Sequence, residues 1–466
     1  MANDDEKAKL FRRIAGANVH LVVERMRVHG FWPQGEGLPP DPKEEVDERG
    51  RIDREIAELA AKGLAGGPHA TDKALHEERM RRWEESKKRR ALKKKQREVA
   101  AAERRAAWGE TKRKNLVHAG EGVSAGLQDT RSDEEKLRAL SLPVLHTAND
   151  LVAAIGITLS RLRFLTYHRA GTALVHYHRY GIPKKSGGIR SISAPKRDLK
   201  DAQDWIHTRL LAAPSVEAEA HGFVPERSIV TNARTHVGKR VVINLDLVDF
   251  FPTITYRRTK GLFSSFGYSE QVATCLALLC TEPPRVPVML DGARCYVAIG
   301  ARVLPQGAPT SPSITNLVCR KLDRRLRGLA QRHGFQYTRY ADDLTFSGDN
   351  GAAVGRLLRS VRSILTDEGF VEHPKKTRIM RRGRRQEVTA IVVNDRMGVA
   401  RDELRKLRAI LHNAGKHGLM SQNRENHPNF AAYLRGRVAF VRMVDPSKGP
   451  MLSAALERAL ARANQE

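Results

Sequence analysis

Phe335-Gln-Tyr-Thr-Arg-Tyr-Ala-Asp-Asp-Leu-Thr-Phe-Ser347 is the stretch that decides the fold. Aromatic and β-branched residues flank a short acidic centre, a pattern that predicts a strand, a tight turn and a second strand. The turn brings Asp342 and Asp343 together, and two neighbouring carboxylates repel each other unless a cation lies between them. The hairpin is therefore a candidate site for Mg²⁺, which prefers one or two carboxylates plus substrate phosphates. Because Asp is also a common turn former, a solvated turn is the alternative.

A second acidic stretch lies upstream, in Val241-Val-Ile-Asn-Leu-Asp-Leu-Val-Asp-Phe-Phe-Pro252. Its first half has the composition of a buried strand, and Asp246 lies inside that apolar run. A buried carboxylate is costly unless it is paired or bound to a metal, so Asp246 is either a ligand or a hydrogen-bonded structural residue. Asp249 follows at the predicted end of the strand, where it is also a candidate cap for the next helix.

Composition and charge limit the class of protein. A chain of 466 residues predicts two to four domains. The formal net charge of +29 and the pI near 10.3 favour a polyanionic partner, most plausibly nucleic acid, over a merely soluble basic protein. The four cysteines lack zinc-ligand spacing and are expected to be buried thiols in a reducing compartment. No apolar run reaches membrane-spanning length and no signal peptide opens the chain, so we expect a cytoplasmic protein without membrane contact.

The N-terminal third is predicted to be helical. Residues 1–70 contain two amphipathic helices separated by a Gly- and Pro-rich break, and residues 71–139 form a basic helical arm followed by a linker at 117–131. The arm carries the runs Lys87–Arg90 and Lys93–Lys95 among few apolar residues, which indicates a long, exposed helix. It is either an RNA-contacting element or a solvated spacer.

A compact body is expected from Leu140 onward. Two short helices precede a basic glycine hairpin at 176–195, whose cations and backbone N–H groups suit phosphates. The loop Leu304-Pro-Gln-Gly-Ala-Pro-Thr-Ser-Pro312 opens one long helix, with Thr310 and Ser311 as candidate caps. A helix at 354–365, a strand at 388–393 and a helical tail rich in Arg and Lys follow.

Three carboxylates from separate strands are what metal-dependent nucleotidyl transfer requires. Two metal ions about 4 Å apart activate an attacking hydroxyl and stabilise a leaving oxygen. Asp246, Asp342 and Asp343 supply that set, within an α/β palm flanked by a basic hairpin and basic helices. From the residues alone, the chain is predicted to carry out templated, metal-dependent nucleotidyl transfer.

From about Leu140 to the C-terminus the chain resembles the reverse transcriptases, and more narrowly the retron reverse transcriptases of the myxobacterial kind. Tyr340-Ala-Asp-Asp343 matches the catalytic box, and Asn244-Leu-Asp-Leu-Val-Asp-Phe-Phe251 matches the box with the first catalytic aspartate, Asp246. The resemblance implies a right-hand polymerase fold of the α/β (α+β) class, with an antiparallel palm sheet and a helical thumb. Fingers and palm would span 140–395 and the thumb 396–466. It also implies two Mg²⁺ ions, with Mn²⁺ as a substitute, held by the three aspartates.

Further positions carry over residue by residue, and each role is what the resemblance implies. Phe251 packs under the incoming sugar and selects deoxynucleotides, Gln306 and Gly307 contact nucleotide and template, and Arg190 meets the triphosphate. Lys376 protonates the pyrophosphate, with Lys375 as a substitute. The RNA-recognising positions are Asn232 and His236 in an N-A-x-x-H element and Arg435 and Arg437 in the thumb. Val388-Thr389-Ala390 departs from the family's V-T-G, which puts the backbone at Ala390 in question.

The resemblance implies a specific reaction. A retron enzyme binds a cognate non-coding RNA, primes from a 2′-OH of an internal guanosine, and uses dNTPs to copy part of that RNA into branched, RNA-linked single-stranded DNA (msDNA). Such systems act with an effector protein in antiphage defence. The alternatives are a reverse transcriptase of the group II intron or diversity-generating type, and a catalytically silent RNA-binding protein on the same scaffold.

Overall fold

The computed structural model describes Glu24 and residues 27–30, 34–35, 43–64, 68–184 and 187–463, in two compact units, 1–106 and 107–466. The first predicted amphipathic helix lies almost wholly outside the described residues. In the N-terminal unit, α3 (Lys43–Leu64) is joined to α4 (Pro68–Lys114), which continues into the second unit, by an ion pair of 2.7 Å between Glu55 and Arg82. The two helices confirm the helices predicted for these segments.

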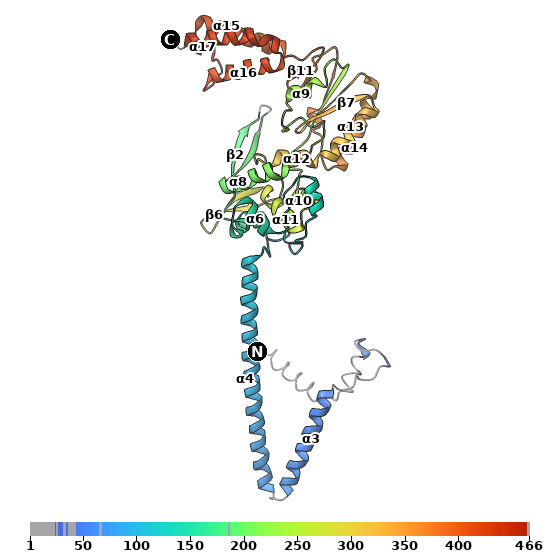
Figure 1. Cartoon of the computed structure of the whole chain (residues 1–466), viewed down its shortest axis with the longest axis vertical. Coiled ribbons are helices and arrows are strands. Elements are labelled where there is room, and N and C mark those ends of the chain that lie inside the picture. The colour runs from blue at the N-terminus through green and yellow to red at the C-terminus, as the bar shows by residue number, and fades with distance from the viewer. Residues whose placement is uncertain are drawn as a thin grey trace. The chain divides into compact units, whose positions relative to one another are not determined.

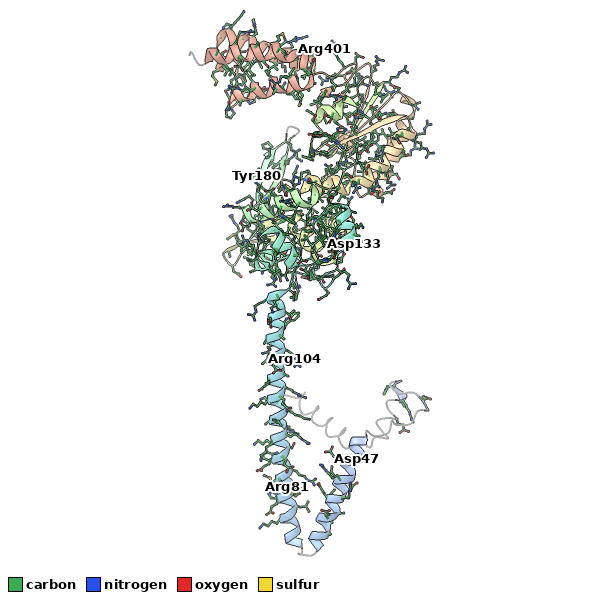
Figure 2. The ribbon with its side chains drawn as sticks, viewed as in Figure 1. Asp47, Arg81, Arg104, Asp133, Tyr180 and Arg401 are labelled. Atoms are coloured by element: carbon green, nitrogen blue, oxygen red, sulfur yellow. The ribbon has the colours of Figure 1, made fainter. Side chains whose placement is uncertain are left out.

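α4 is one continuous helix with side chains projecting all around it (Figures 1 and 2). Its basic runs at 87–90 and 93–95 are exposed, and Trp83 is 56% exposed beneath the ammonium of Lys87. A helix without an apolar face has no core to bury itself against, so ion pairs such as Arg82–Glu78 support it locally.

The stretch at 117–131 is not a free linker, contrary to the prediction. Ala119, Val123 and Leu127 are buried in the main core of the second unit, although three glycines interrupt this stretch. Arg163 donates hydrogen bonds to the carbonyls of Lys112 and Arg113 at the end of α4, and to that of Asn115, just after the helix, at 2.8 Å. The folded body therefore begins well before Leu140.

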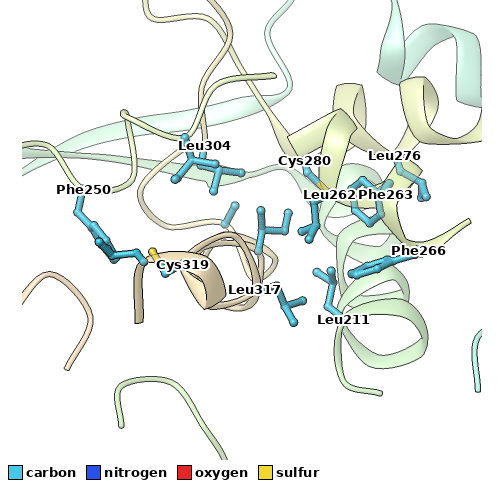
Figure 3. Packing of buried hydrophobic residues seen from close by; sticks show 14 of the residues in the cluster. Leu211, Phe250, Leu262, Phe263, Phe266, Leu276, Cys280, Leu304, Leu317 and Cys319 are labelled. Carbon is cyan, nitrogen blue, oxygen red and sulfur yellow. The ribbon is translucent and has the colours of Figure 1, made fainter. Parts of the chain in front are cut away.

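The first half of the C-terminal unit is mainly helical. α5 (Glu134–Ala139), α6 (Ala148–Ile155) and α7 (Leu159–Thr166) precede α8 (Arg197–Ile206), which ends in a π-turn at His207–Leu211; α10 (Tyr256–Phe266) and α11 (Glu270–Cys280) come later in the chain. Thr147 and Asp150 form a capping box at the start of α6. α11 is buried along its whole length, and its Leu276 and Cys280 pack with Phe263 and Leu262 of α10 (Figure 3).

Two small antiparallel sheets belong to this half. β2 (Tyr177–Pro183) and β3 (Ile189–Pro195) form the predicted basic hairpin, with Ile182 opposite Arg190. β1 (Gly171–Thr172), β6 (Ala293–Ala298) and β5 (Arg285–Leu290) form a three-stranded sheet in that order.

The central sheet is antiparallel, in the order β7-β8-β4-β9. Its strands are β4 (Val241–Asp246), β7 (Phe335–Tyr340), β8 (Asp343–Gly348) and β9 (Arg378–Arg381). The two predicted acidic strands are therefore direct neighbours, although about one hundred residues separate them in sequence. α13 (Arg320–Arg332) packs against β7 and against α14 (Val354–Asp367).

A second core joins α9 (Ile229–Arg234) and the short strands β10 (Glu387–Val388) and β11 (Ile391–Val392) to three C-terminal helices. These helices are α15 (Arg401–His417), α16 (Phe430–Val444) and α17 (Gly449–Ala463), as the sequence predicted for the tail. The boundaries 140–395 and 396–466 for fingers, palm and thumb stay predictions. None of the helices in the described ranges is both long and apolar enough to cross a membrane.

Several local predictions were wrong. The long helix after Pro312 is two helices, α12 (Ser311–Val318) and α13, with a break at Cys319, and Thr310 makes no side-chain cap. The strand at 388–393 is a tight hairpin, because Thr389 and Ala390 have φ values of 46° and 65°. Thr255, not Asp249, caps α10. Three cysteines are buried free thiols as expected, but Cys295 is only partly buried.

Candidate active site

The turn between β7 and β8 presents two carboxylates at the end of the central sheet. Tyr340 pairs with Asp343 across the hairpin, so the turn consists of Ala341 and Asp342, with Ala341 at a φ of 57°. On the other side of β8, Asp343 lies opposite Asp246 in the register of β4. The carbonyl of Asp342 also accepts a hydrogen bond of 3.1 Å from the amide of Leu247. The three predicted aspartates are therefore brought together.

The charges of these side chains are only partly neutralised by the protein. Burial, followed by the negative charges of Asp342 and Asp246, raises the pKa of Asp343 to about 7. Burial also raises the pKa of Asp342, with Asp246 adding to the effect and Lys376 and Arg190 opposing it. Both carboxyl groups thus hold a proton more tightly than usual, first because burial disfavours the ionised form and then because negative charges lie nearby.

Among the described residues, Lys376 is the one cation in contact with the aspartates. It lies in a 3-10 turn, Pro374–Lys376, and its ammonium donates a hydrogen bond of 2.7 Å to the Oδ2 of Asp246. The amide of His373 bonds to the carbonyl of Asp246 at 2.7 Å, which fixes this turn against the end of β4. Lys376 therefore balances one carboxylate in this arrangement and leaves Asp342 and Asp343 without a contacting cation among the described residues.

The three aspartates suit a divalent cation by their charge, but they do not form a complete coordination sphere. In the part of the chain that the structure describes, no group of three or more His, Cys, Asp or Glu side chains could hold a metal ion by itself. The ammonium of Lys376 already contacts the Oδ2 of Asp246. Mg²⁺ needs only one or two carboxylates when substrate phosphates supply other ligands. A bound cation would also favour the ionised forms of Asp342 and Asp343, whose pKa values are raised by burial and by neighbouring negative charge.

A buried network behind the turn holds the hairpin, and the sequence did not reveal it. Arg339 of β7 is fully buried and binds both carboxylate oxygens of Asp323, at 2.8 and 2.7 Å. It also donates to Asn316 and to the carbonyl of Ala341, so the guanidinium supports the turn directly. The backbone of Gly222 also packs closely against the turn, since a Cβ at this position would lie 2.6 Å from the amide nitrogen of Ala341. An apolar stretch interrupted by Arg339, with Asp323 on the preceding helix, was the available signal.

The residues expected to meet the nucleotide lie on elements next to this centre. Arg190 on β3 is exposed, and its positive charge opposes the rise in the pKa of Asp342 that burial causes. The carbonyl of Gln306 accepts a hydrogen bond of 2.8 Å from the amide of Ser193 on β3, which ties the 304–312 loop to the basic hairpin. Gly307 has a φ of 115°, and a Cβ there would meet the Cγ2 of Ile192 at 2.8 Å. Phe251 is half-buried, with its ring 6.3 Å from that of Phe223.

Comparison with known proteins agrees with this geometry. The model of the family "Reverse transcriptase (RNA-dependent DNA polymerase)" matches residues 182–410. Over 327 residues the chain is 45% identical to the retron Mx65 reverse transcriptase of Myxococcus xanthus, covering 70% of this chain and 75% of the relative. It is 42% identical over 433 residues to the retron Mx162 reverse transcriptase of the same organism, covering 88% of this chain and 87% of the relative. The chain belongs to the retron reverse transcriptases.

The family relationship extends beyond myxobacteria. The chain is 34% identical over 313 residues to the retron Ec86 reverse transcriptase of Escherichia coli, covering 66% of this chain and 88% of the relative. The present chain, as a retron reverse transcriptase, is an RNA-directed DNA polymerase whose partners are an RNA template and a DNA product. Reverse transcriptases generally depend on divalent cations. The predicted right-hand polymerase fold is confirmed.

Two residues predicted to bind RNA are buried in the reverse transcriptase. His236 is fully buried between the hydroxyls of Ser347 and Thr338, each 2.7 Å from a ring nitrogen. Burial lowers its pKa to about 3, so the ring is neutral. Asn232 is 1% exposed and lies 3.5 Å from the hydroxyl of Thr389. Neither side chain is available for direct contact, because both hold α9 against the sheet and the 389–390 turn.

The thumb arginines differ from each other in environment. Arg435 is exposed on α16 and is available for contact with phosphate. Arg437 is partly buried and lies 3.3 Å from a carboxylate oxygen of Glu403 on α15. At the departure from V-T-G, exposed Ala390 adopts the left-handed backbone that glycine would adopt without strain. The substitution of alanine for glycine therefore leaves the turn in the conformation that a glycine there would favour.

Proposed function

We propose that this reverse transcriptase copies its cognate non-coding RNA into RNA-linked single-stranded DNA, with Asp246, Asp342 and Asp343 as the catalytic carboxylates. The observation that carries this proposal is the register that sets Asp246 opposite Asp343 at the turn containing Asp342. When bound, two Mg²⁺ ions would supply Lewis-acid stabilisation of the attacking and leaving oxygens, and Mn²⁺ would substitute for them. The aspartates would hold these ions in place.

The chain's own side chains would position the nucleotide. A hydroxyl of the RNA, and then the 3′-OH of the growing DNA, attacks the α-phosphorus of a dNTP. The bond to pyrophosphate breaks as the new P–O bond forms, and the hydroxyl proton leaves to solvent. Arg190 would bind the triphosphate, Gln306 and Gly307 would line the template side, and Phe251 would exclude a 2′-OH. Lys376, now paired with Asp246, would give a proton to the pyrophosphate, with exposed Lys375 as its substitute.

Initiation would use a 2′-OH of an internal guanosine, which leaves a branched msDNA. The experiment incubates the purified protein with the RNA that co-purifies with it, dNTPs and Mg²⁺, and then treats the product with ribonuclease and with a debranching enzyme. A DNA that keeps a short RNA branch after ribonuclease and loses it after debranching is expected. A linear product from an ordinary 3′-OH primer contradicts self-priming, and no dNTP incorporation at all favours the catalytically silent RNA-binding protein.

Basic surfaces away from the aspartates would provide most of the RNA affinity. The exposed runs of α4 and Arg435 of α16 suit phosphates, because each neutralised phosphate releases counterions. Replacing the four residues of Lys87–Arg90 with glutamine should weaken RNA binding and reduce its salt dependence. An unchanged salt slope would assign α4 the role of a spacer.

The biological role we propose is antiphage defence in the cytoplasm, together with an effector protein. It is supported by membership of the retron family and by the absence, among the described helices, of one that could span a membrane. The test compares phage plating on cells carrying the complete retron with wild-type enzyme or with Asp342→Asn. Protection that is independent of Asp342 would contradict a role for the DNA product.

A further inference from the structure

A pocket in the first half of the C-terminal unit, separate from the aspartates, combines exposed aromatic rings with arginines that form no ion pair among the described residues. It has a volume of about 280 Å³ and is lined by the C-terminal end of α7, the segment from β1 into β2, the end of α11 and the start of β5. None of the residues proposed for catalysis or nucleotide binding lines it. The function argued above therefore leaves this pocket unexplained.

Two aromatic side chains stand at the pocket with their rings partly in solvent. Phe164 and Tyr167 are 43% and 40% exposed, although both lie at the end of a helix whose other apolar residues are buried. Each ring has a guanidinium over its face, Arg161 at 4.8 Å and Arg169 at 4.7 Å from the ring centroids. Exposed aromatic and guanidinium planes are the surfaces on which unpaired bases stack.

The pocket also carries positive charge that the described residues do not neutralise. Four arginines line it, and no carboxylate in the described ranges lies within 4 Å of any of them: Arg163, Arg169, Arg285 and Arg302. Three of them are held by backbone carbonyls, for example Arg302 by Leu278 at 2.7 Å and Arg285 by Ala170 at 3.1 Å. A carbonyl fixes a guanidinium in place but does not remove its charge.

The acidic residue in the pocket is already engaged. Glu282 is 9% exposed and forms an ion pair of 2.7 Å with Arg179, which does not itself line the pocket. His176 adds no charge near neutral pH, because burial lowers its pKa. Partial burial of the guanidinium likewise lowers the pKa of Arg302, to about 10, which leaves it protonated under ordinary conditions. The net charge of the lining is therefore clearly positive.

We propose that this pocket binds one unpaired nucleotide of an RNA strand, with Phe164 and Tyr167 stacking on the base and the arginines binding its phosphate. A pocket of about 280 Å³, just below the usual range of about 300 to 1,000 Å³ for small-molecule sites, has room for part of a single nucleotide and not for a duplex. The exposed rim, with Leu174 at 62%, leaves room for the strand to enter and leave. RNA is preferred to a free nucleotide because the enzyme's template is RNA, and to this extent the inference rests on the proposed function.

The test maps contacts directly, because other basic surfaces of the enzyme also bind RNA. A single-stranded RNA containing 4-thiouridine is photo-crosslinked to the full-length protein, and crosslinked peptides are identified by mass spectrometry. Crosslinks within residues 164–176 are expected. The double variant Phe164→Leu with Tyr167→Leu keeps the apolar volume but removes the rings, so these crosslinks should fall about tenfold, the loss expected for one unstacked base. The matched variant Phe164→Tyr with Tyr167→Phe should keep them.

A second measurement reads the charge. Arg169→Gln should lower the slope of log affinity for single-stranded RNA against log salt by about 0.7, the change expected for one lost phosphate contact. Arg169→Lys should restore it. The proposal would be overturned if the wild-type protein crosslinked to RNA only outside residues 164–176, or if the two leucine substitutions left the crosslinks unchanged. It would also be overturned if free AMP bound at this pocket while no RNA crosslinked there.

Extension of oligo(dT) on poly(rA) is measured in parallel for the wild type, and folding of the leucine variant is checked by far-UV circular dichroism, which should match that of the wild type. The crosslinks do not depend on catalysis. An enzyme without polymerase activity that still crosslinks at this pocket would refute the proposed function alone, and an active enzyme without these crosslinks would refute the pocket alone.

Discussion

The β7–β8 hairpin is associated with two acidic sites, one contacting strand β7 and one at the turn, and their charges are compensated in opposite ways. Behind the hairpin, Asp323 is fully buried and receives two hydrogen bonds from Arg339 and one of 2.8 Å from the hydroxyl of Tyr337. At its tip, Asp343 lies opposite Asp246 and next to Asp342, and among the described residues the contacting cation, Lys376, binds Asp246. A structural carboxylate is provided with its counter-ion by the fold, whereas the carboxylates at the tip leave charge to be balanced by something the chain does not supply.

The largest effect should come from removing charge at the tip. Asp342→Asn or Asp246→Asn should reduce DNA synthesis by about a thousandfold or more, because the electrostatic stabilisation of the transferring phosphoryl group is lost. RNA affinity, measured by filter binding, should stay nearly unchanged, since Lys and Arg elsewhere make the phosphate contacts. Primer extension measures the activity. Asp249→Asn is the matched control, because Asp249 is exposed only three positions from Asp246 and should retain activity. Parallel loss of RNA binding would mean that the aspartates support the fold instead.

The next test breaks the compensated site. Asp323→Asn leaves Arg339 buried with an unpaired charge and should lower the free energy of unfolding by about 3–5 kcal/mol. Urea denaturation measures it. Replacing the pair together, Asp323→Leu with Arg339→Met, should recover much of that loss because no buried charge remains. If the single variant were as stable as the wild type, the two acidic sites would not differ as described.

The same substitution at the tip should have the opposite sign. The folded-state pKa of Asp343, about 7, is above its ordinary value of 3.8. The contribution of protonated Asp343 to the free energy of unfolding is therefore fully present below about pH 4 and is lost as the pH rises through 7. Without divalent cations at pH 8, Asp343→Asn should therefore be more stable than the wild type by about 2 kcal/mol, a value discounted for partial solvent access.

Denaturation at pH 5 and pH 8 in EDTA measures this pH dependence. Asp395→Asn is the control, since the Asp395 side chain is 78% exposed and should show no such effect. Added Mg²⁺ should stabilise the wild type and not Asp343→Asn. Equal pH dependence in wild type and Asp343→Asn would remove the case for uncompensated charge.

The smallest effect extends the comparison to backbone strain. Ala341 in the catalytic turn and Ala390 in the β10–β11 turn both have positive φ, but Ala341 is buried and Ala390 exposed. Ala390→Gly should stabilise by about 0.5–1 kcal/mol, because it relieves the left-handed conformation and buries no less surface. Ala341→Gly should gain less, since its methyl group is packed. Thermal unfolding compares the two, and a greater gain at Ala341 would contradict this account.

Local patterns predicted the elements well where periodicity and composition were strong. The hairpin at 335–347, the strand at 241–246, the β2–β3 hairpin and the C-terminal helices follow from them. The predictions failed where tertiary packing overrode the pattern. Residues 117–131 look like a linker because of their glycines, yet they are packed against the core, and the strand at 388–393 is bent back by two left-handed residues.

The residues of the candidate site likewise fall into those that the sequence predicted and those that it did not. Asp246, Asp342 and Asp343 were found from sequence, since acidic residues inside apolar strands are unusual. Asn232 and His236 were also singled out, but the RNA contact assigned to them is not available to side chains this deeply buried. Asp323, Asn316 and Gly222 were missed, because a buried partner on a helix and a glycine in a loop carry no local signal of what they touch.

The sequence by itself determined most of the strands and helices and which acidic side chains are unusual in them, because these properties depend mainly on near neighbours along the chain. Only the tertiary structure decided that β4 lies beside β8 in the register that opposes Asp246 to Asp343, and that Arg339 neutralises Asp323 while Asp343 stays uncompensated. Register and charge compensation depend on residues tens to a hundred positions apart, and their free energies arise only when those residues are desolvated together.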